Sequence, residues 1–240
     1  MGDIVKVGWS GGKDSSCAVM LHLERGDKVK AVCYIPMFTD NIPLIRKNHY
    51  EFILKTADKF RSMGAEVYIV KGMTYWDYVN YIPKRGKNVG KIMGFPPYIV
   101  GMCTFKNYSK KKALNSIDVG EYDYEDFGIA VDEIKGQGQL NEKIRSILVE
   151  ERYTEKDATI FCQIKETYSP HYEDDTRDGC SLCPHASKRR RELWFQDYPE
   201  AKNLLIQLQD IVKEKRPDRP PLRNKQYFIE TDIVQLSIFD

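Results

Sequence analysis

Long apolar segments are missing from this chain of 240 residues. No stretch approaches the roughly 20 consecutive apolar residues that a membrane-spanning helix requires, which excludes a helical membrane protein. The first residues, MGDIVKVGWS, also lack the basic flank, apolar stretch and cleavage site of a secretory signal peptide. We therefore expect a soluble, cytoplasmic protein without a membrane partner.

An excess of charge of one sign is also missing. The chain has 37 Lys and Arg residues against 35 Asp and Glu residues, a formal net charge of +2. Nothing in this balance requires nucleic acid or anionic lipid as a partner. With 42% hydrophobic and 30% charged residues, the composition is typical of one globular unit, with room for a small additional subdomain.

Cysteines are few, and none follows Cys183. In a chain of this size without a leader, six cysteines are more typical of thiols or metal ligands than of a disulfide framework. Cys180 and Cys183 have a spacing that suits one metal ion, whereas a zinc ribbon would need a second such pair. His171 and His185 are near enough in sequence to be alternative ligands. A redox dithiol and two inert thiols are the other interpretations of this pair.

The first third of the chain alternates two kinds of segment. Residues 4–7, 29–36 and 65–72 are short apolar runs that predict strands, and residues 14–26 and 49–64 predict helices that end at glycines. Uniformly apolar strands that alternate with helices are typical of a parallel sheet covered by helices. We therefore predict an α/β fold, with an open, mostly parallel twisted sheet and helices on both of its faces.

The rest of the chain is less regular. Its pattern predicts a helix over 103–117, a strand over 124–133, a helix over 139–152 and one or two helices over 186–215. The expected domains are an α/β domain over residues 1–165, a CxxC-containing helical subdomain over 166–215 and an extended tail over 216–240.

A glycine-rich segment, WSGGKDSSC, follows the first predicted strand. It is not a Walker loop, because that pattern has four residues between its first glycine and its Gly-Lys pair. Its glycines let successive backbone N–H groups turn inward and form a nest for anionic oxygens, and the N-terminus of the next helix adds partial positive charge. The candidate nucleotide-binding residues are Ser10, Gly11, Gly12, Lys13, Asp14, Ser15 and Ser16.

Two charged residues of this loop are the candidate catalytic residues. Lys13 offers a mobile cation to phosphate, whereas Asp14 would repel phosphate and is better interpreted as a helix cap or as a ligand of phosphate-bound Mg²⁺. The alternative is an ordinary strand-to-helix turn. The combination of a lysine, an aspartate and paired serines favours phosphate binding.

The SGGKDS stretch resembles the SGGxDS signature of the PP-loop ATP pyrophosphatase superfamily. Later segments resemble its phosphoadenosine phosphosulfate (PAPS) reductase-like branch, including forms from phages and DNA sulfur-modification systems. These segments are CTFKNYSKKKAL, FGIAVDE and SPHYEDDTRDGCSLCP. The match covers most of residues 3–200 in the family's order. It departs from the family after FGIAVDE, where Lys135 and Arg145 follow instead of an arginine closer to the strand.

This resemblance implies an adenine nucleotide alpha hydrolase-like fold that binds ATP or PAPS across the carboxyl ends of its strands. Gly128, within FGIAVDE, is then also a nucleotide-binding residue. In members that use ATP with Mg²⁺, a substrate oxygen attacks the α phosphate, and an adenylated intermediate and pyrophosphate result.

The resemblance also brings Cys103 toward Cys180 and Cys183. Three cysteines could bind a 4Fe–4S cluster, with Zn²⁺ as the alternative metal. Cys162 is a conceivable fourth ligand, but a small buried side chain is the better interpretation, as it is for Cys17 and for Cys33.

The chain departs from the classical PAPS reductases in its cysteines. Those enzymes have a catalytic cysteine in a C-terminal ECGxH-type motif, and here no cysteine follows Cys183. The vicinal cysteine pair of cluster-bearing sulfonucleotide reductases is missing too. The leading hypothesis is therefore an enzyme that adenylates a substrate for sulfur-transfer chemistry. The alternatives are a sulfonucleotide reductase and a non-catalytic nucleotide-binding subunit of a DNA-modification or defence complex.

Two further features bear on partners. The basic runs over 110–112 and 188–192 could contact the phosphates of a nucleotide or of a nucleic acid acceptor, although such runs are more often solvated faces. The segment Gln235–Phe239 resembles the short peptides with which bacterial proteins bind the replicative sliding clamp. The alternative for this segment is an edge strand or helix packed on the protein body.

Overall fold

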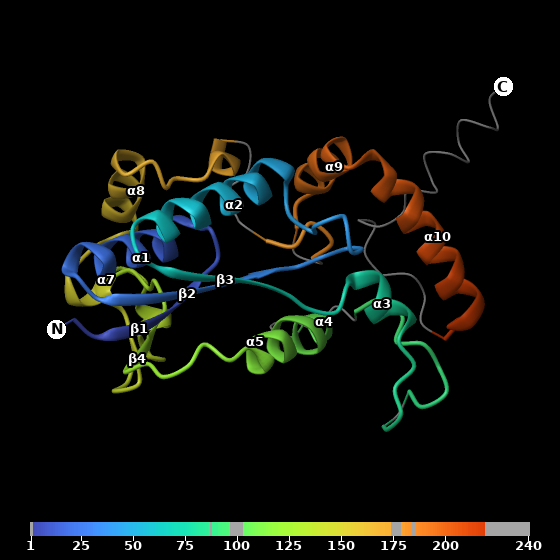
Figure 1. Ribbon diagram of the computed structural model, residues 1–240. Helices are drawn as coiled ribbons and strands as arrows, with labels where there is room; N and C mark the ends of the chain where they lie inside the picture. The colour runs from blue at the N-terminus through green and yellow to red at the C-terminus, as the bar shows by residue number, and fades with distance from the viewer. Residues whose placement is uncertain (1, 87, 97–102, 174–178, 184–185, 219–240) are drawn as a thin grey trace. The chain divides into compact units, whose positions relative to one another are not determined.

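The computed structural model describes residues 2–86, 88–96, 103–173, 179–183 and 186–218. The chain forms two compact units (Figure 1). The sheet unit comprises residues 1–35, 45–71 and 113–178, and the helical unit comprises residues 36–44, 72–112 and 179–240. This division differs from the expected boundaries, because residues 72–112 belong with the CxxC segment and residues 166–178 belong with the sheet. The sliding-clamp-like peptide lies outside the described residues.

The sheet unit confirms the predicted α/β fold. Its strands are β1 (Ile4–Trp9), β2 (Lys28–Ile35), β3 (Glu66–Lys71), β4 (Tyr124–Asp126) and β5 (Ile144–Arg145). They pair in the order β3-β2-β1-β4-β5, and every pairing is parallel. Helices flank the sheet, and none of the helices in the described part of the chain has the length and apolar character that crossing a bilayer requires.

Helices α1 (Lys13–Arg25) and α2 (Lys47–Ser62) lie along the same side of strands β1 to β3 (Figure 1). The predicted stop of α1 is confirmed, because Gly26 follows the helix with a φ of 86° and its N–H bonds to carbonyls of the last turn. The described remainder of this unit adds α6 (Ile134–Gln137), α7 (Ile147–Glu150), α8 (Glu155–Ile164) and the 3₁₀ turn η2 (Pro170–Glu173).

Two predictions for the segment after residue 120 are wrong in detail. The strand predicted over 124–133 ends at Asp126, and the helix predicted over 139–152 is replaced by β5 and α7. Asn141 explains the second difference, because its side-chain oxygen accepts hydrogen bonds from the N–H groups of Lys143 and Ile144. This local turn competes with helix formation and delivers Ile144 to its partner on β4, Glu125.

The helical unit is built on an aromatic core. Its helices are α3 (Tyr75–Asn80), α4 (Thr104–Lys106), the π turn η1 (Asn107–Lys111), α9 (Lys188–Asp197) and α10 (Pro199–Lys215), and α5 (Lys112–Ser116) continues η1 across the unit boundary. Tyr75 packs edge-on against Phe105, and the buried indole of Trp194 donates to the carbonyl of Pro43 over 2.8 Å. The helix predicted over 103–117 is confirmed, and the region over 186–215 forms two helices.

A buried polar network joins α1 to β4 and α7. His22 contacts Asp27 through Nδ1 at 2.8 Å and Asp126 through Nε2 at 3.2 Å, and Asp126 also accepts the N–H of Ile147 at 2.6 Å. Burial alone would raise the pKa of Asp27, but His22 and Arg25 outweigh it, and the pKa lies below 3.8. Asp27 therefore stabilises the fold fully at pH values above 3.8, its pKa in the unfolded chain. This contribution is lost as the pH falls through the lower pKa of the folded state.

Replacing Asp126 by Ala should lower the free energy of unfolding by about 2–4 kcal/mol, because it leaves the buried N–H of Ile147 and Nε2 of His22 without their partner. The matched control is Asp58→Ala, which breaks an exposed ion pair with Arg61 and should change stability little. Urea unfolding followed by circular dichroism measures both. Equal midpoints for the two variants would contradict the structural role of Asp126.

Candidate functional site

The predicted phosphate loop lies at the carboxyl end of β1, the middle strand of the sheet. The chain proceeds from β1 to β2 and β3 on one side and returns to β4 on the other side of β1. In open parallel sheets, ligands bind at such a switch point, outside the carboxyl ends of the strands. Residues 10–12 after β1 and residues 127–130 after β4 lie at this place.

Gly11 has a conformation and an environment that only glycine fits. Its φ is +81°, and a Cβ atom there would lie 2.5 Å from Cγ1 of Ile53 and 2.9 Å from Cε1 of His49. The loop therefore packs with its backbone directly on α2, which carries both of these side chains. Gly12 then provides the N-cap of α1.

Hydrogen bonds of serine hydroxyls within residues 10–15 stabilise the conformation of the loop. The N–H of Ser10 donates to Oγ of Ser15 at 3.1 Å, and the N–H of Gly12 donates to Oγ of Ser10 at 3.2 Å. The hydroxyl of Ser15 donates in turn to the carbonyl of Gly12 at 3.1 Å. The third hydroxyl-bearing candidate differs: Ser16 is buried, and its Oγ accepts the indole N–H of Trp9 at 3.0 Å. Ser16 thus connects the first turn of α1 to β1.

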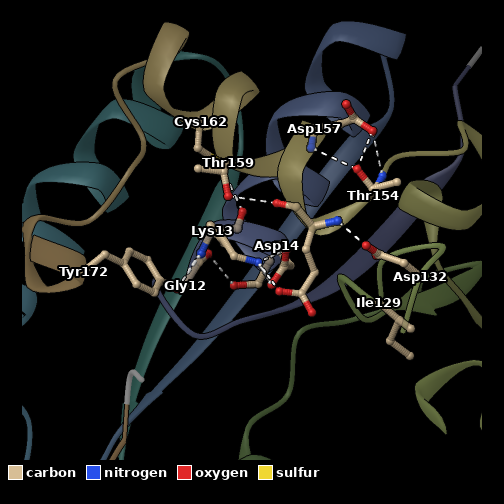
Figure 2. A network of polar contacts seen from close by, with 12 residues as sticks. Gly12, Lys13, Asp14, Ile129, Asp132, Thr154, Asp157, Thr159, Cys162 and Tyr172 are labelled. Carbon is tan, nitrogen blue, oxygen red and sulfur yellow. Dashed lines mark hydrogen bonds and ion pairs between the residues drawn. The ribbon is translucent and has the colours of Figure 1, made fainter. Parts of the chain in front are cut away.

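Lys13 is enclosed by polar partners (Figure 2). Its Nζ donates to both carboxylate oxygens of Asp14, at 2.8 and 2.9 Å, and to Glu155 at 3.0 Å. Its backbone N–H donates to the hydroxyl of Tyr172 at 3.1 Å. Figure 2 shows these contacts converging on the first residue of α1.

Burial and neighbouring charges shift the pKa values of Lys13 and Asp14. Burial alone would lower the pKa of Lys13, but Asp14 and Glu155 outweigh it, and the pKa lies above 10.5. Burial raises the pKa of Asp14 above 3.8 in spite of the lysine beside it. Lys13 is therefore a full cation at neutral pH, and its charge is balanced by carboxylates on α1 and α8.

Helix α8 holds Lys13 from both its side chain and its backbone. Its first residue, Glu155, reaches Nζ, and the thiol of Cys162 donates to the carbonyl of Lys13 at 3.1 Å (Figure 2). The N–H of Glu155 is itself held by Asp132 at 3.0 Å. Sequence analysis missed Glu155 and Tyr172. The capping box of Thr154 and Asp157 marks the start of α8 in the sequence, but nothing local connects that start to residue 13.

Gly128 lies against the loop through its backbone. A Cβ atom at this position would lie 2.5 Å from the carbonyl oxygen of Asp14 and 2.7 Å from the N of Ser15. The residue therefore allows close packing between the segment after β4 and the first turn of α1. Its observed contacts are with the protein backbone, and its role in nucleotide binding stays a prediction.

Cys17 and Cys162 form a buried thiol pair in the sheet unit. Both side chains are fully buried and hydrogen-bond to each other, and this bond together with burial raises the pKa of Cys17. Cys33 is fully buried as well. The interpretation of all three as small buried side chains fits their positions, but the pairing of Cys17 with Cys162 was not predicted.

The other three cysteines belong to the helical unit. Cys103 precedes α4, and Cys180 and Cys183 form a tight turn in which the N–H of Cys183 donates to the carbonyl of Cys180 at 2.9 Å. Burial raises the pKa of the Cys180 and Cys103 thiols, and Cys183 lies near enough to both to add to this effect. Within the described residues, however, no three Cys, His, Asp or Glu side chains stand together as ligands of one metal ion.

One of the two alternative histidine ligands, His171, lies within the described residues. His171 lies in η2 of the sheet unit, where its ring contacts the hydroxyl of Ser169. His185 lies outside the described residues. The basic run over 188–192 is also not simply a solvated face, because Arg190 and Arg191 are buried in the helical unit.

Replacing Gly11 by Ala should distort the loop and lower the free energy of unfolding by about 2–4 kcal/mol, from unfavourable φ together with overpacking against Ile53 and His49. Gly26→Ala is the matched control, since Gly26 has a similar φ of +86° and nothing within 4 Å of its Cβ position. The control should lose only about 1–2 kcal/mol. Urea unfolding of both variants tests this, and equal losses would refute the packing of the loop on α2.

Comparison with known proteins leaves the site to be interpreted from its own geometry. A scan against protein-family models and a search of curated protein sequences each returned no significant match.

Proposed function

We propose that the sheet unit binds the phosphate groups of an adenine nucleotide at residues 10–15, and that the protein adenylates a substrate for sulfur-transfer chemistry. The observation that carries the proposal is the loop itself. A glycine-rich turn at the switch point of a parallel sheet leads into a helix whose first residue is a charged lysine. The resemblance to PAPS reductase-like PP-loop proteins supplies the reaction class.

Two backbone N–H groups of the loop donate hydrogen bonds to side-chain hydroxyls, and phosphate oxygens could replace these hydroxyls as acceptors. The N–H groups of Gly12 and Lys13 donate to the hydroxyls of Ser10 and Tyr172. A phosphate oxygen is a stronger acceptor because it is charged. Binding would therefore replace neutral acceptors by anionic ones without creating new donors.

Lys13 would supply charge where the reaction develops it. A substrate oxygen attacks the α phosphorus, the bond between this phosphorus and the bridging oxygen breaks, and the bond's electrons leave with pyrophosphate. A lysine that turns from Asp14 and Glu155 toward the bridging oxygen would stabilise that negative charge. The raised pKa of Lys13 keeps it protonated throughout the neutral range.

The carboxylates that Lys13 would leave fit a magnesium ion bound mainly by the nucleotide. Mg²⁺ in such sites takes one or two protein carboxylates together with phosphate oxygens. Asp14, with Glu155 beside the same lysine, offers this oxygen chemistry. When bound, the ion would neutralise the phosphates, and Asp14 would orient them toward the loop.

The central experiment measures binding and products on the purified full-length protein. We expect Mg-ATP and pyrophosphate to bind in calorimetry, and ATP to be converted slowly to AMP and pyrophosphate with water as acceptor. Lys13→Met should lower this conversion by about 100-fold or more, because an electrostatic contact to the leaving group is lost. The control is Lys143→Met at an exposed lysine, which should leave it unchanged.

The same assay separates the alternatives. Sulfite release from PAPS without ATP cleavage would instead favour the sulfonucleotide reductase. Nucleotide binding with neither product would favour a non-catalytic subunit. Failure to bind ATP, pyrophosphate and PAPS would refute the proposal.

We further propose that Cys103, Cys180 and Cys183 bind a 4Fe–4S cluster, or Zn²⁺, in the helical unit. The three cysteines belong to one unit, and Cys183 lies near both of the others, which supports this proposal. Within the described residues they do not form a complete ligand set, so metal binding would require the three thiols to move closer together.

Metal analysis of anaerobically purified protein tests this assignment. Iron and acid-labile sulfide, or zinc, should accompany the native chain and disappear when Cys180 and Cys183 are both replaced by Ser. The matched control, Cys33→Ser, changes a buried cysteine of β2 and should retain the metal. A native protein without iron or zinc would contradict the assignment.

A further inference from the structure

Two buried histidines share one serine hydroxyl beneath the phosphate loop. Nδ1 of His49, on α2, lies 2.8 Å from Oγ of Ser169, and Nδ1 of His171, on η2, lies 2.7 Å from the same oxygen. The ring centroids of the two histidines are 4.2 Å apart. All three side chains are at most 2% exposed, so this group is part of the protein interior.

The hydrogen bonds determine which ring nitrogens carry protons. His49 also bonds to the backbone of Ser10, a bond that favours the protonated ring, and the N–H of Ser10 is already donated to Ser15. Since Nδ1 of His49 faces Ser169, we assign the Nε2–H to the carbonyl of Ser10 and the role of acceptor of the Ser169 hydroxyl proton to Nδ1. Because that hydroxyl has a single proton, its oxygen must accept Nδ1–H from His171.

This arrangement requires His49 to be neutral. Burial, together with the facing ring of His171, lowers the pKa of His49 to about 3. The direction of the hydrogen bonds, from His171 through Ser169 and His49 to Ser10, is thus the same across the neutral range.

His49 and His171 connect to the loop at two places, before and after its glycines. On one side, the His49 ring packs against Gly11 and bonds to Ser10. On the other side, the His171 ring packs on the ring of Tyr172 with centroids 4.0 Å apart, and the hydroxyl of Tyr172 accepts the N–H of Lys13.

We propose that His49, Ser169 and His171 are positioning residues of the phosphate loop, which they orient by holding the carbonyl of Ser10 toward the protein interior. A carbonyl oxygen directed at a phosphate would repel it. Turning this carbonyl inward leaves the following N–H groups facing the anion, which is the requirement of a backbone nest. The inference rests on the proposed phosphate binding, but its structural part can be tested without any nucleotide.

Three variants in the full-length protein separate hydrogen bonding from packing. His49→Leu keeps the apolar volume against Gly11 and removes both polar atoms. His49→Gln supplies an amide N–H and an amide oxygen near the positions of the two ring nitrogens. Ser169→Ala leaves both rings in place and removes the hydroxyl between them, which keeps the proposal testable if His49→Leu fails to fold.

The first measurement is amide hydrogen exchange of residues 9–17 by mass spectrometry, without added phosphate. Exchange in this segment should accelerate in His49→Leu and Ser169→Ala and return close to the native rate in His49→Gln. Unchanged exchange in both His49→Leu and Ser169→Ala would overturn the inference. Equal acceleration in His49→Gln and His49→Leu would also overturn it, because shape rather than hydrogen bonding would then hold the loop.

The second measurement is calorimetric binding of inorganic pyrophosphate and Mg-ATP. Affinity should fall about 10-fold in His49→Leu, the effect of one lost hydrogen bond at a charged site, and stay within about threefold in His49→Gln. If the native protein binds neither probe, the proposed function fails, while the exchange experiment still decides whether these residues orient the loop. Native affinity in His49→Leu would refute the positioning role in binding.

Discussion

Close backbone packing around the first turn of α1 is the constraint on which the sheet unit depends. Gly11 lies on α2 with no room for a Cβ atom, and Gly128, in the segment after β4, lies equally close to the backbone of Asp14 and Ser15. The carbonyl of Lys13 accepts the thiol of Cys162. Side chains of α2 and α8 and the backbone after β4 thus contact the main chain of residues 11–15, and this close packing limits the conformations that the loop can adopt.

The electrostatics of the site follow from this packing. A lysine brought into a crowded, partly buried turn needs carboxylate partners, and Asp14 and Glu155 provide them at hydrogen-bonding distance. Burial raises the pKa of Asp14, so the charged form of this carboxylate is stabilised less than in water even with Lys13 beside it.

The sequence predicted the local part of this arrangement well and the non-local part poorly. Strands β1 to β3, their helices and the glycine stop at Gly26 are each encoded by periodicity and by residues adjacent in the chain. Strands β4 and β5 contain only 3 and 2 residues, too few for any periodicity to appear. The partners of the loop on α8, on η2 and in His49 lie far along the chain, and only tertiary packing brings them to it.

The division of the chain into interleaved segments limits how the two units can be separated from each other. Both units take their residues from three separate stretches, so the polypeptide passes from one unit to the other at 35/36, 44/45, 71/72, 112/113 and 178/179. No single cut in the chain can release either unit whole, and no single recombination event can transfer one to another protein. A truncation at any one of these positions would therefore leave each remaining piece with an incomplete unit.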